Sequence, residues 1–305
     1  MHTISHSQPA CLSHSLEIHT AKWTSNEICD SRLEQQPMIK FICFGSGSSG
    51  NCYYINADGY GLLIDEGIGI RKFKKYFRDY GLSFGDIKGI LVTHDHADHV
   101  RAVGAVSIEF HLPVYALADV YMGMNRNRFV RKKVPAPLAN TIVAGETFDL
   151  GPFKITPFQV PHDSADNCGY FISVNNTTFC LMTDVGHVTE TMRHHLSNAK
   201  YIVVESNYDA YMLENGRYPR HLKDRIRNGT GHMDNADTAK LLSECLSADA
   251  RHIWLCHLSE ENNRPDLALQ TVSEALKQAG RLSEDDPLTL EALQRTHPSK
   301  LYELK

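Results

Sequence analysis

The stretch LVTHDHADHV, residues 91–100, places three histidines and two aspartates within six positions, directly after an apolar run. His94 and His96 lie two residues apart at the end of an expected strand, so in extended backbone both side chains point to the same side. Asp98 and His99 follow where the chain turns into a helix. The string can offer two imidazoles to one metal ion and a carboxylate and an imidazole to a second, ligands of the kind that zinc prefers.

Further polar residues stand directly after apolar segments, where a sheet would bring its strand ends together. His162 follows ITPFQVP, Asp184 follows TFCLMT and His257 follows HIWLC. We expect these three side chains to complete a two-metal site. Asp65, in GLLIDEG, is a fourth carboxylate at a strand end, and we assign it to hold a ligand histidine by a hydrogen bond.

The composition restricts the class of protein. Of the 305 residues, 42% are hydrophobic and 22% charged, as in an ordinary globular domain. No apolar run reaches the about 18 residues that a membrane span requires, so no membrane association is expected. The net charge of −5 gives no overall basic signature, so any nucleic-acid binding rests on local patches. The eight cysteines form no CxxC pair, which indicates reduced thiols and a cytoplasmic location, and leaves metal binding to histidines and carboxylates.

The chain is expected to hold one structured domain, residues 38–305. Residues 1–37 are polar and mixed without the pattern of a secretory signal, so they are expected to be disordered or a mis-assigned extension, with Met38 as a candidate start. Beyond them, runs of strands alternate with helices, which include one at 98–111 and one at 118–129. This order predicts an α/β (α+β) fold of four layers, an αββα sandwich.

Three other segments suggest contacts with phosphate. In FGSGSSGN, residues 44–51, the candidates are Ser46, Ser48, Ser49 and Asn51, since backbone amides of such a tight joint can cradle an anion. His232, in GTGHMDN, precedes a helix that Asn or Asp caps, which suits a phosphate. Basic clusters at 216–227, with Arg220 and Lys223, and at 126–133 could follow a phosphate backbone.

The ligand string followed by His162, Asp184 and His257, with Asp65 ahead, resembles the five-motif pattern of the metallo-β-lactamase superfamily. The resemblance implies two groups of metal ligands bridged by Asp184: His94, His96 and His162 in one, and Asp98, His99 and His257 in the other. It implies the αββα fold but not a substrate, because one fold serves many reactions.

Several segments together resemble one subfamily, the YycJ or WalJ type: GSGSSGN, ESNYD, YPRHLKDRI, GTGHMDN and HLSEENN. That resemblance implies a bacterial cytosolic exonuclease that acts on DNA with two divalent ions, Zn²⁺ or Mn²⁺. The sequence departs from the subfamily pattern at Met233 and Asp234, where a form closer to GHLSN is usual, and at Tyr208, where histidine is frequent. Asp234 can still cap a helix, although it adds negative charge near the expected phosphate site.

The expected reaction is hydrolysis of a phosphodiester by a hydroxide that bridges two metals. Asp98, His232 and Asp65 are the candidate catalytic residues. Other hydrolases of the superfamily remain alternatives: an RNA-processing nuclease, a cyclic phosphodiesterase or a thioesterase of the glyoxalase II type. The short segment after His257 argues against the thioesterase, which has a C-terminal helical domain. Neither the choice of Zn²⁺ or Mn²⁺ nor the oligomeric state follows from the sequence.

Overall fold

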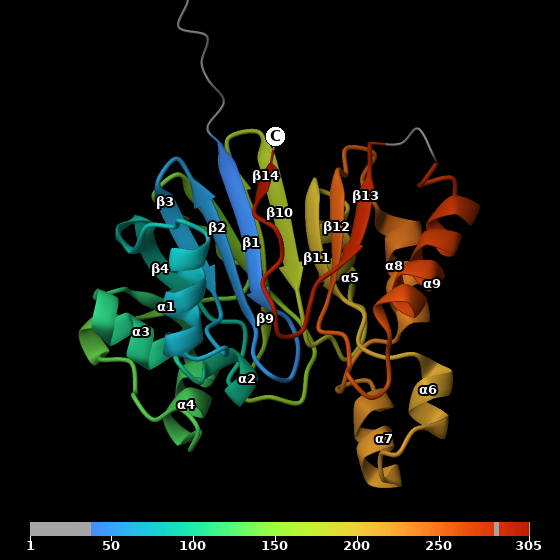
Figure 1. Ribbon diagram of the computed structural model, residues 1–305, viewed down its shortest axis with the longest axis horizontal. Helices are drawn as coiled ribbons and strands as arrows, with labels where there is room; N and C mark the ends of the chain where they lie inside the picture. Colours follow the sequence, from blue (N-terminus) through green and yellow to red (C-terminus); the bar gives the residue numbers. More distant parts are fainter. Residues whose placement is uncertain (1–37, 284–286, 305) are drawn as a thin grey trace, which may run out of the picture. The chain divides into compact units, whose positions relative to one another are not determined.

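Two seven-stranded sheets form the centre of the computed structural model, which describes residues 38–283 and 287–304 (Figure 1). The expectation for residues 1–37 therefore lies outside the described residues. The first sheet has the order β14-β1-β2-β3-β4-β5-β6, and β3 to β6 run parallel. Its strands are β1 (Ile39–Gly45), β2 (Cys52–Ala57), β3 (Tyr60–Ile64), β4 (Ile87–Leu91), β5 (Val114–Leu117), β6 (Ala139–Ile142) and β14 (Tyr302–Leu304).

The second sheet has the order β13-β12-β11-β10-β9-β8-β7, and β10 to β13 are parallel. Parallel pairing brings the carboxyl ends of β10, β11 and β12 to one edge, as it does for β3 and β4 in the first sheet. The strands are β7 (Phe148–Leu150), β8 (Phe153–Gln159), β9 (Cys168–Val174), β10 (Thr177–Met182), β11 (Tyr201–Glu205), β12 (His252–Cys256) and β13 (Thr289–Ala292).

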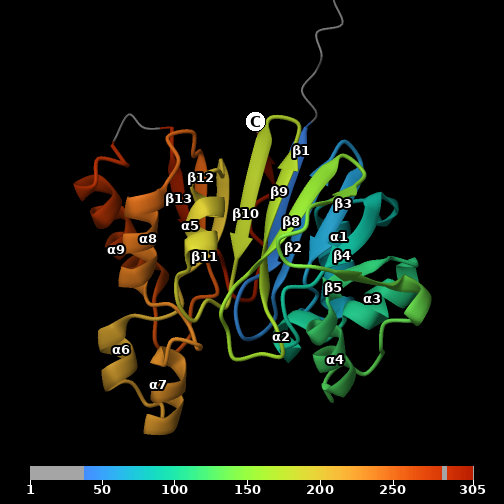
Figure 2. The ribbon, with the colours of Figure 1, turned by 180° about the vertical axis from the view of Figure 1, so that it is seen from behind.

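Helices cover the outer face of each sheet, and Figures 1 and 2 show them on opposite sides of the sheet pair. Beside the first sheet lie α1 (Ile70–Asp79), α2 (Ala97–Val100), α3 (Val103–Phe110) and α4 (Ala118–Arg126). Beside the second lie α5 (Glu190–Leu196), α8 (Asn235–Cys245) and α9 (Pro265–Gln278), while α6 (Ala210–Asn215) and α7 (Arg220–Arg227) lie at one end. The predicted αββα sandwich is confirmed. In the described part of the chain, no helix has the length and apolar character needed to cross a bilayer.

Aromatic side chains join the two sheets in the core. The ring of Phe41, on β1, lies 4.6 Å from that of Trp254, on β12, and 5.1 Å from that of Phe179, on β10, between ring centroids. All three side chains are buried. Burial of such large rings contributes much of the free energy that holds the sheets face to face.

The predicted helix at 98–111 is wrong as a single element, because it consists of the two helices α2 and α3. A continuous helix would need Ala102 N to donate to Asp98 O. Instead Ala102 N donates to Glu66 O at 2.9 Å, and Asp98 O accepts from Asn51 N at 2.7 Å. Backbone groups that would bond to each other within one helix bond instead to Glu66 and Asn51. These bonds hold the turn at residues 94–102, which carries the ligand string.

One further helix is shorter than predicted, and three elements were not predicted. The helix expected at 118–129 ends at Arg126 because Asn127 leaves the helix, its side-chain amide donating to Asp95 O at 2.8 Å. Helix α7 forms within the basic cluster at 216–227. The short terminal piece after residue 287 adds one edge strand to each sheet, β13 beside β12 and β14 beside β1.

Candidate active site

The expected ligands come together at the carboxyl ends of the strands. His94 follows β4, His162 follows β8, Asp184 follows β10 and His257 follows β12. The helix α2 carries Asp98 and His99. Because both sheets end here, side chains far apart in the sequence meet in one cluster.

Asp184 lies between the two groups of ligands. Its Oδ1 is 3.7 Å from His162 Nε2 and 4.0 Å from His94 Nε2, and its Oδ2 is 3.1 Å from His99 Nε2. Oδ1 also lies 3.7 Å from His257 Nδ1, so the carboxylate is close to histidine nitrogens of both groups, as a residue shared by two metals must be.

The cluster fits divalent metal ions. His94, His96 and His162 can each offer one atom so that all three lie within 4.8 Å of one another, and Asp98, His99 and His257 form a second such set. Nε2 of His94 and Nε2 of His257 are buried and have no hydrogen-bond partner among the described residues. A buried nitrogen without a partner is costly, and coordination of a metal by its lone pair removes that cost.

Three polar residues of the site have left-handed backbone just beyond their strands: Asp65 (φ 60°), Asp184 (φ 55°) and His257 (φ 53°). This conformation costs about 1–2 kcal/mol for a residue with a Cβ. Such strain persists only where the surrounding structure holds it, and it clusters at functional sites. The left-handed conformation at these three positions directs the side chains of Asp65, Asp184 and His257 into one cluster.

Asp65 forms hydrogen bonds with Thr93 and His99, at the start and the end of the ligand string. Its Oδ2 lies 2.7 Å from His99 Nδ1, and its two oxygens accept bonds of 2.8 Å from the backbone N and the hydroxyl of Thr93. The bond to Nδ1 leaves Nε2 of His99 to face Asp184 and a metal.

Glu205, at the end of β11, is a site residue that the sequence reasoning missed. Its Oε1 lies 2.9 Å from His232 Nδ1 and 3.1 Å from His257 Nδ1, and its Oε2 accepts from Val185 N at 2.8 Å. Its side chain is fully buried. The apolar segment YIVV before Glu205 gives the same signal that identified Asp184 and His257.

Burial and neighbouring charges shift the pKa values of the ionisable groups of the site. Burial lowers the pKa of His94 well below its usual value, so its imidazole is neutral and ready to bind a metal. Burial alone would raise the pKa of Glu205, but His232 and His257 outweigh it and lower the pKa to about 2. Burial would lower the pKa of His232, yet Glu205 and then Asp184 raise it above its usual value. The pair therefore holds a carboxylate beside an imidazolium.

Two of the four phosphate candidates in the Ser-rich loop do not fit that role, because they are buried and already bonded. Ser46 Oγ accepts from His257 N at 2.9 Å and lies 2.9 Å from the Tyr53 hydroxyl. Asn51 N donates to Asp98 O at 2.7 Å, and Asn51 Oδ1 accepts from Gly47 N at 2.8 Å. Ser46 and Asn51 hold ligand residues in position, whereas Ser48 and Ser49 are exposed.

The expectation of a phosphate at the N-terminus of α8 also does not fit. Asp234 is the N-cap, and its Oδ1 accepts from Asp237 N at 2.7 Å. A carboxylate thus occupies the position where an anion would bind. On α7, Arg220 pairs with Asp224 at 3.7 Å, and Lys223 Nζ donates to the carbonyl of Glu214 at 2.5 Å.

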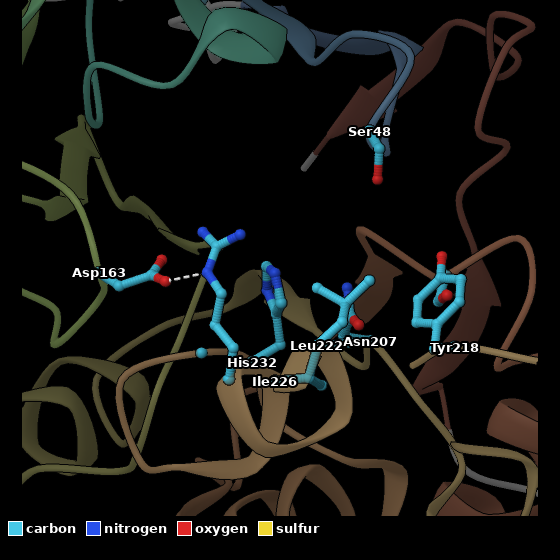
Figure 3. Close-up of a pocket in the computed structure, with 10 residues that line it drawn as sticks. Ser48, Asp163, Asn207, Tyr218, Leu222, Ile226 and His232 are labelled. Atoms are coloured by element: carbon cyan, nitrogen blue, oxygen red, sulfur yellow. Dashed lines mark hydrogen bonds and ion pairs between the residues drawn. The ribbon is translucent and has the colours of Figure 1, made fainter. Parts of the chain in front are cut away.

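A small cavity of about 150 Å³ opens beside His232 (Figure 3). Ser48, from the Ser-rich loop, and Arg225, from α7, are among the residues that line it. Arg225 forms an ion pair with Asp163, next to the candidate ligand His162. A cation and an exposed hydroxyl therefore stand beside the ligand cluster.

Comparison with known proteins agrees with this geometry. The family model of the beta-lactamase superfamily domain matches residues 61–258. The chain is 34% identical to exodeoxyribonuclease YycJ of Bacillus anthracis over 79% of this chain and 90% of that protein. It is 32% identical to exodeoxyribonuclease WalJ of Streptococcus pneumoniae over 79% of this chain and 89% of that protein. The metallo-beta-lactamase fold protein YhfI from Bacillus subtilis shares the fold, with a TM-score of 0.64, 16% identity and coverage of 87% of this chain and 99% of that one.

Proposed function

The chain belongs to the beta-lactamase superfamily, and within it to the family of the YycJ and WalJ exodeoxyribonucleases, and we propose that it is a metal-dependent exonuclease that removes nucleotides from an end of DNA. The observation that carries the proposal is the pair of ligand sets on either side of Asp184, next to the Glu205–His232 pair. A site of this kind supplies both a place for a phosphate and a proton for the departing oxygen.

Two divalent ions, Zn²⁺ or Mn²⁺, are the proposed cofactors. His94, His96 and His162 would hold one ion, and Asp98, His99 and His257 the other, with Asp184 shared. When bound, the ions supply Lewis acidity toward the phosphate and the attacking water. Asp65 fixes the ring of His99, and Ser46 fixes the backbone of His257.

His232 is the proposed proton donor. Its imidazole lies beside the ligand cluster, with Nδ1 3.8 Å from Asp184 Oδ1, and it lines the small cavity that Ser48 and Arg225 share. Glu205 keeps Nδ1 bonded, which leaves Nε2 to give a proton to the leaving oxygen. Ser48 and Arg225 would bind the phosphate oxygens next to it.

The test is a nuclease assay with 5′-labelled and 3′-labelled linear duplex DNA, single-stranded DNA and RNA, in Mn²⁺ or Zn²⁺. Covalently closed circular DNA is the control, because it offers no end. Loss of label from one end with intact circles supports the proposal, and Asp184→Asn should abolish it while the variant still folds. Cleavage of circles as fast as linear DNA, or hydrolysis of thioesters without cleavage of any nucleic acid, would overturn it.

We further propose that residues 38–305 form a single hydrolase domain that works in the cytoplasm. Its proposed substrate is DNA, as in the names of the exodeoxyribonucleases YycJ and WalJ. Six cysteines of the described residues are free thiols, and five of these are buried. Free thiols in this number suit a reducing compartment.

A further inference from the structure

The two basic clusters of the chain differ in how their charges are used. All three arginines of α7 are paired with carboxylates, at Arg220–Asp224, Arg225–Asp163 and Arg227–Glu214. Paired cations offer less net positive charge to a ligand. Lys223 of α7 has no carboxylate partner among the described residues, although its Nζ donates to the carbonyl of Glu214, so α7 keeps one cation that no carboxylate neutralises.

The basic segment, residues 126–133, behaves differently. Within residues 38–283 and 287–304, no carboxylate pairs with the side chains of Arg126, Arg128, Arg131 or Lys132, and the same holds for Arg101, which lies next to the segment. All five of these side chains are exposed. Their charges remain available to neutralise phosphates.

The backbone of the basic segment is held firmly. Asn127 Oδ1 accepts from Phe129 N at 2.9 Å, and Lys133 Nζ donates to the carbonyls of Met124 at 2.8 Å and Asn127 at 2.9 Å. Val130 is buried. The segment also packs tightly on α3, since a Cβ on Gly104 would lie 2.0 Å from Lys132 O. Lys133 therefore holds the backbone of the basic segment in place, and the other side chains of the segment extend from this fixed backbone.

Phe129 lies near the middle of the basic segment, and 53% of its surface is exposed. The guanidinium carbon of Arg128 lies 5.0 Å from the centroid of its ring. An exposed aromatic ring among free cations is the arrangement that proteins use to bind a nucleic-acid strand, the ring stacking on a base and the cations following the backbone.

Two grooves meet at Phe129. One, of about 640 Å³, is lined by the metal-site residues His96 and Asp98 and by Arg126, Arg128 and Phe129. The other, of about 570 Å³, is lined by Arg101, Arg131 and Lys132 and again by Arg128 and Phe129. A strand that leaves the site can therefore follow a continuous surface past Phe129 and on to Arg101.

We infer that the basic segment and Arg101 bind a DNA strand with unpaired bases, one of which stacks on Phe129. The inference rests on the proposed exonuclease function and names the part of the substrate that reaches beyond the site. The bases must be unpaired because bases inside a duplex already stack on their neighbours and leave no face free for the ring.

Binding of an end-labelled single strand and of a blunt duplex of equal length tests the inference. The DNA carries phosphorothioate linkages that resist cleavage, and binding to the metal-loaded enzyme is measured by fluorescence anisotropy. We expect Phe129→Ala to weaken single-strand binding about 10-fold and blunt-duplex binding much less. Phe129→Trp should retain the affinity, because it keeps a ring to stack on. Tyr211→Ala, which removes a 76% exposed ring on α6, is the matched control.

The charge is tested with Arg128→Ala/Arg131→Ala. We expect the slope of log affinity against log salt to fall by about 0.7 for each phosphate that the variant no longer neutralises. Lys240→Ala/Lys277→Ala, which removes two exposed cations from α8 and α9, should leave the slope as it is. In turnover of DNA with single-stranded tails, the effect of the arginine variant should fall on KM more than on kcat.

The outcomes separate this inference from the proposed function. If the wild type removes nucleotides from DNA ends while Phe129→Ala binds the single strand with unchanged affinity, the inference alone fails. An equal loss of affinity for blunt duplex would overturn the requirement for unpaired bases. If the strand binds through Phe129 but no DNA is cleaved, the exonuclease proposal fails and the binding surface stands.

Discussion

Glu205 Oε1 lies 2.9 Å from Nδ1 of His232, and this pair connects the end of β11 with the loop before α8. The carboxylate is fully buried, whereas the side chain of His232 is 20% exposed. The imidazole thus reaches solvent and the small cavity, while its partner does not. Salt screens an ion pair with a buried member much less than it screens a pair at the surface.

Replacing this carboxylate should move the pH profile of DNA cleavage. Glu205 raises the pKa of His232, so the protonated donor persists to higher pH in the wild type. In Glu205→Gln, burial dominates and lowers that pKa, so we expect the alkaline decline of kcat to begin at lower pH. At pH 8 kcat should fall about 10²-fold.

Glu291→Gln is the matched control, since Glu291 lies 3.5 Å from His252 at the opposite end of β12. Its pH profile should match that of the wild type. Metal content per chain is measured in parallel for both variants. A Glu205→Gln enzyme whose profile keeps its shape and position, with metal retained, would rule out His232 as the proton donor.

Asp65→Asn should weaken metal binding without removing a ligand. The neutral amide oxygen of Asn accepts a weaker hydrogen bond from Nδ1 than the carboxylate does, so the ring of His99 is held less firmly. Loss of such a partner costs about 10- to 100-fold in metal affinity. Titration against a competing chelator measures it, with Asp149→Asn, a change at an exposed position, as the control. Equal affinities for Asp65→Asn and the wild type would contradict the assignment.

The proximity of the candidate site residues could be predicted from the sequence because these residues follow one local rule. Asp65, Asp184 and His257 each stand just beyond an apolar strand, and parallel strands bring such ends together whatever the details of the loops. The fold class followed from the same order of strands and helices. Glu205 obeys this rule too, so its place in the site was open to prediction from the apolar strand that it ends.

The roles that could not be predicted depend on interactions between residues distant in sequence. Ser46 and Asn51 belong to a flexible-looking loop, yet both are buried. The backbone N of His257, beyond β12, donates to Ser46, and the backbone N of Asn51 donates to the carbonyl of Asp98 on α2. Asp234 caps its own helix and so fills the expected phosphate position. The basic clusters look alike in sequence, and the sequence does not show that Asp163 and Glu214 pair with arginines of α7.

Metal should stabilise the protein increasingly as pH rises. Burial alone would lower the pKa of His257, but Asp184 and then Asp98 and Glu205 raise it to about 10. Protonated His257 stabilises the apoprotein fully below its unfolded pKa of about 6.5, and this stability is lost as pH rises toward 10. Over the same range a metal meets less competition from protons.

The measurement compares the thermal unfolding of metal-loaded and EDTA-treated protein at about pH 6.5, 8 and 9.5. We expect the difference in Tm between them to grow with pH. Where free metal exceeds its Kd 1,000-fold, the added free energy of unfolding should be about 4 kcal/mol. A difference that shrinks with pH would contradict proton competition at His257.

The C-terminal strands should contribute to the stability of the whole sandwich. Tyr302, on β14, lies against Trp254 with 4.9 Å between ring centroids, and its hydroxyl donates to Glu291 on β13 at 2.6 Å. It thus ties the edge strands of the two sheets to each other. Tyr302→Ala should lower the free energy of unfolding by about 3–5 kcal/mol, the range for loss of a large buried ring, as measured by urea denaturation of the metal-loaded enzyme. Tyr211→Ala should stay within about 0.5 kcal/mol of the wild type, and a similarly small effect at Tyr302 would show that the edge strands are dispensable.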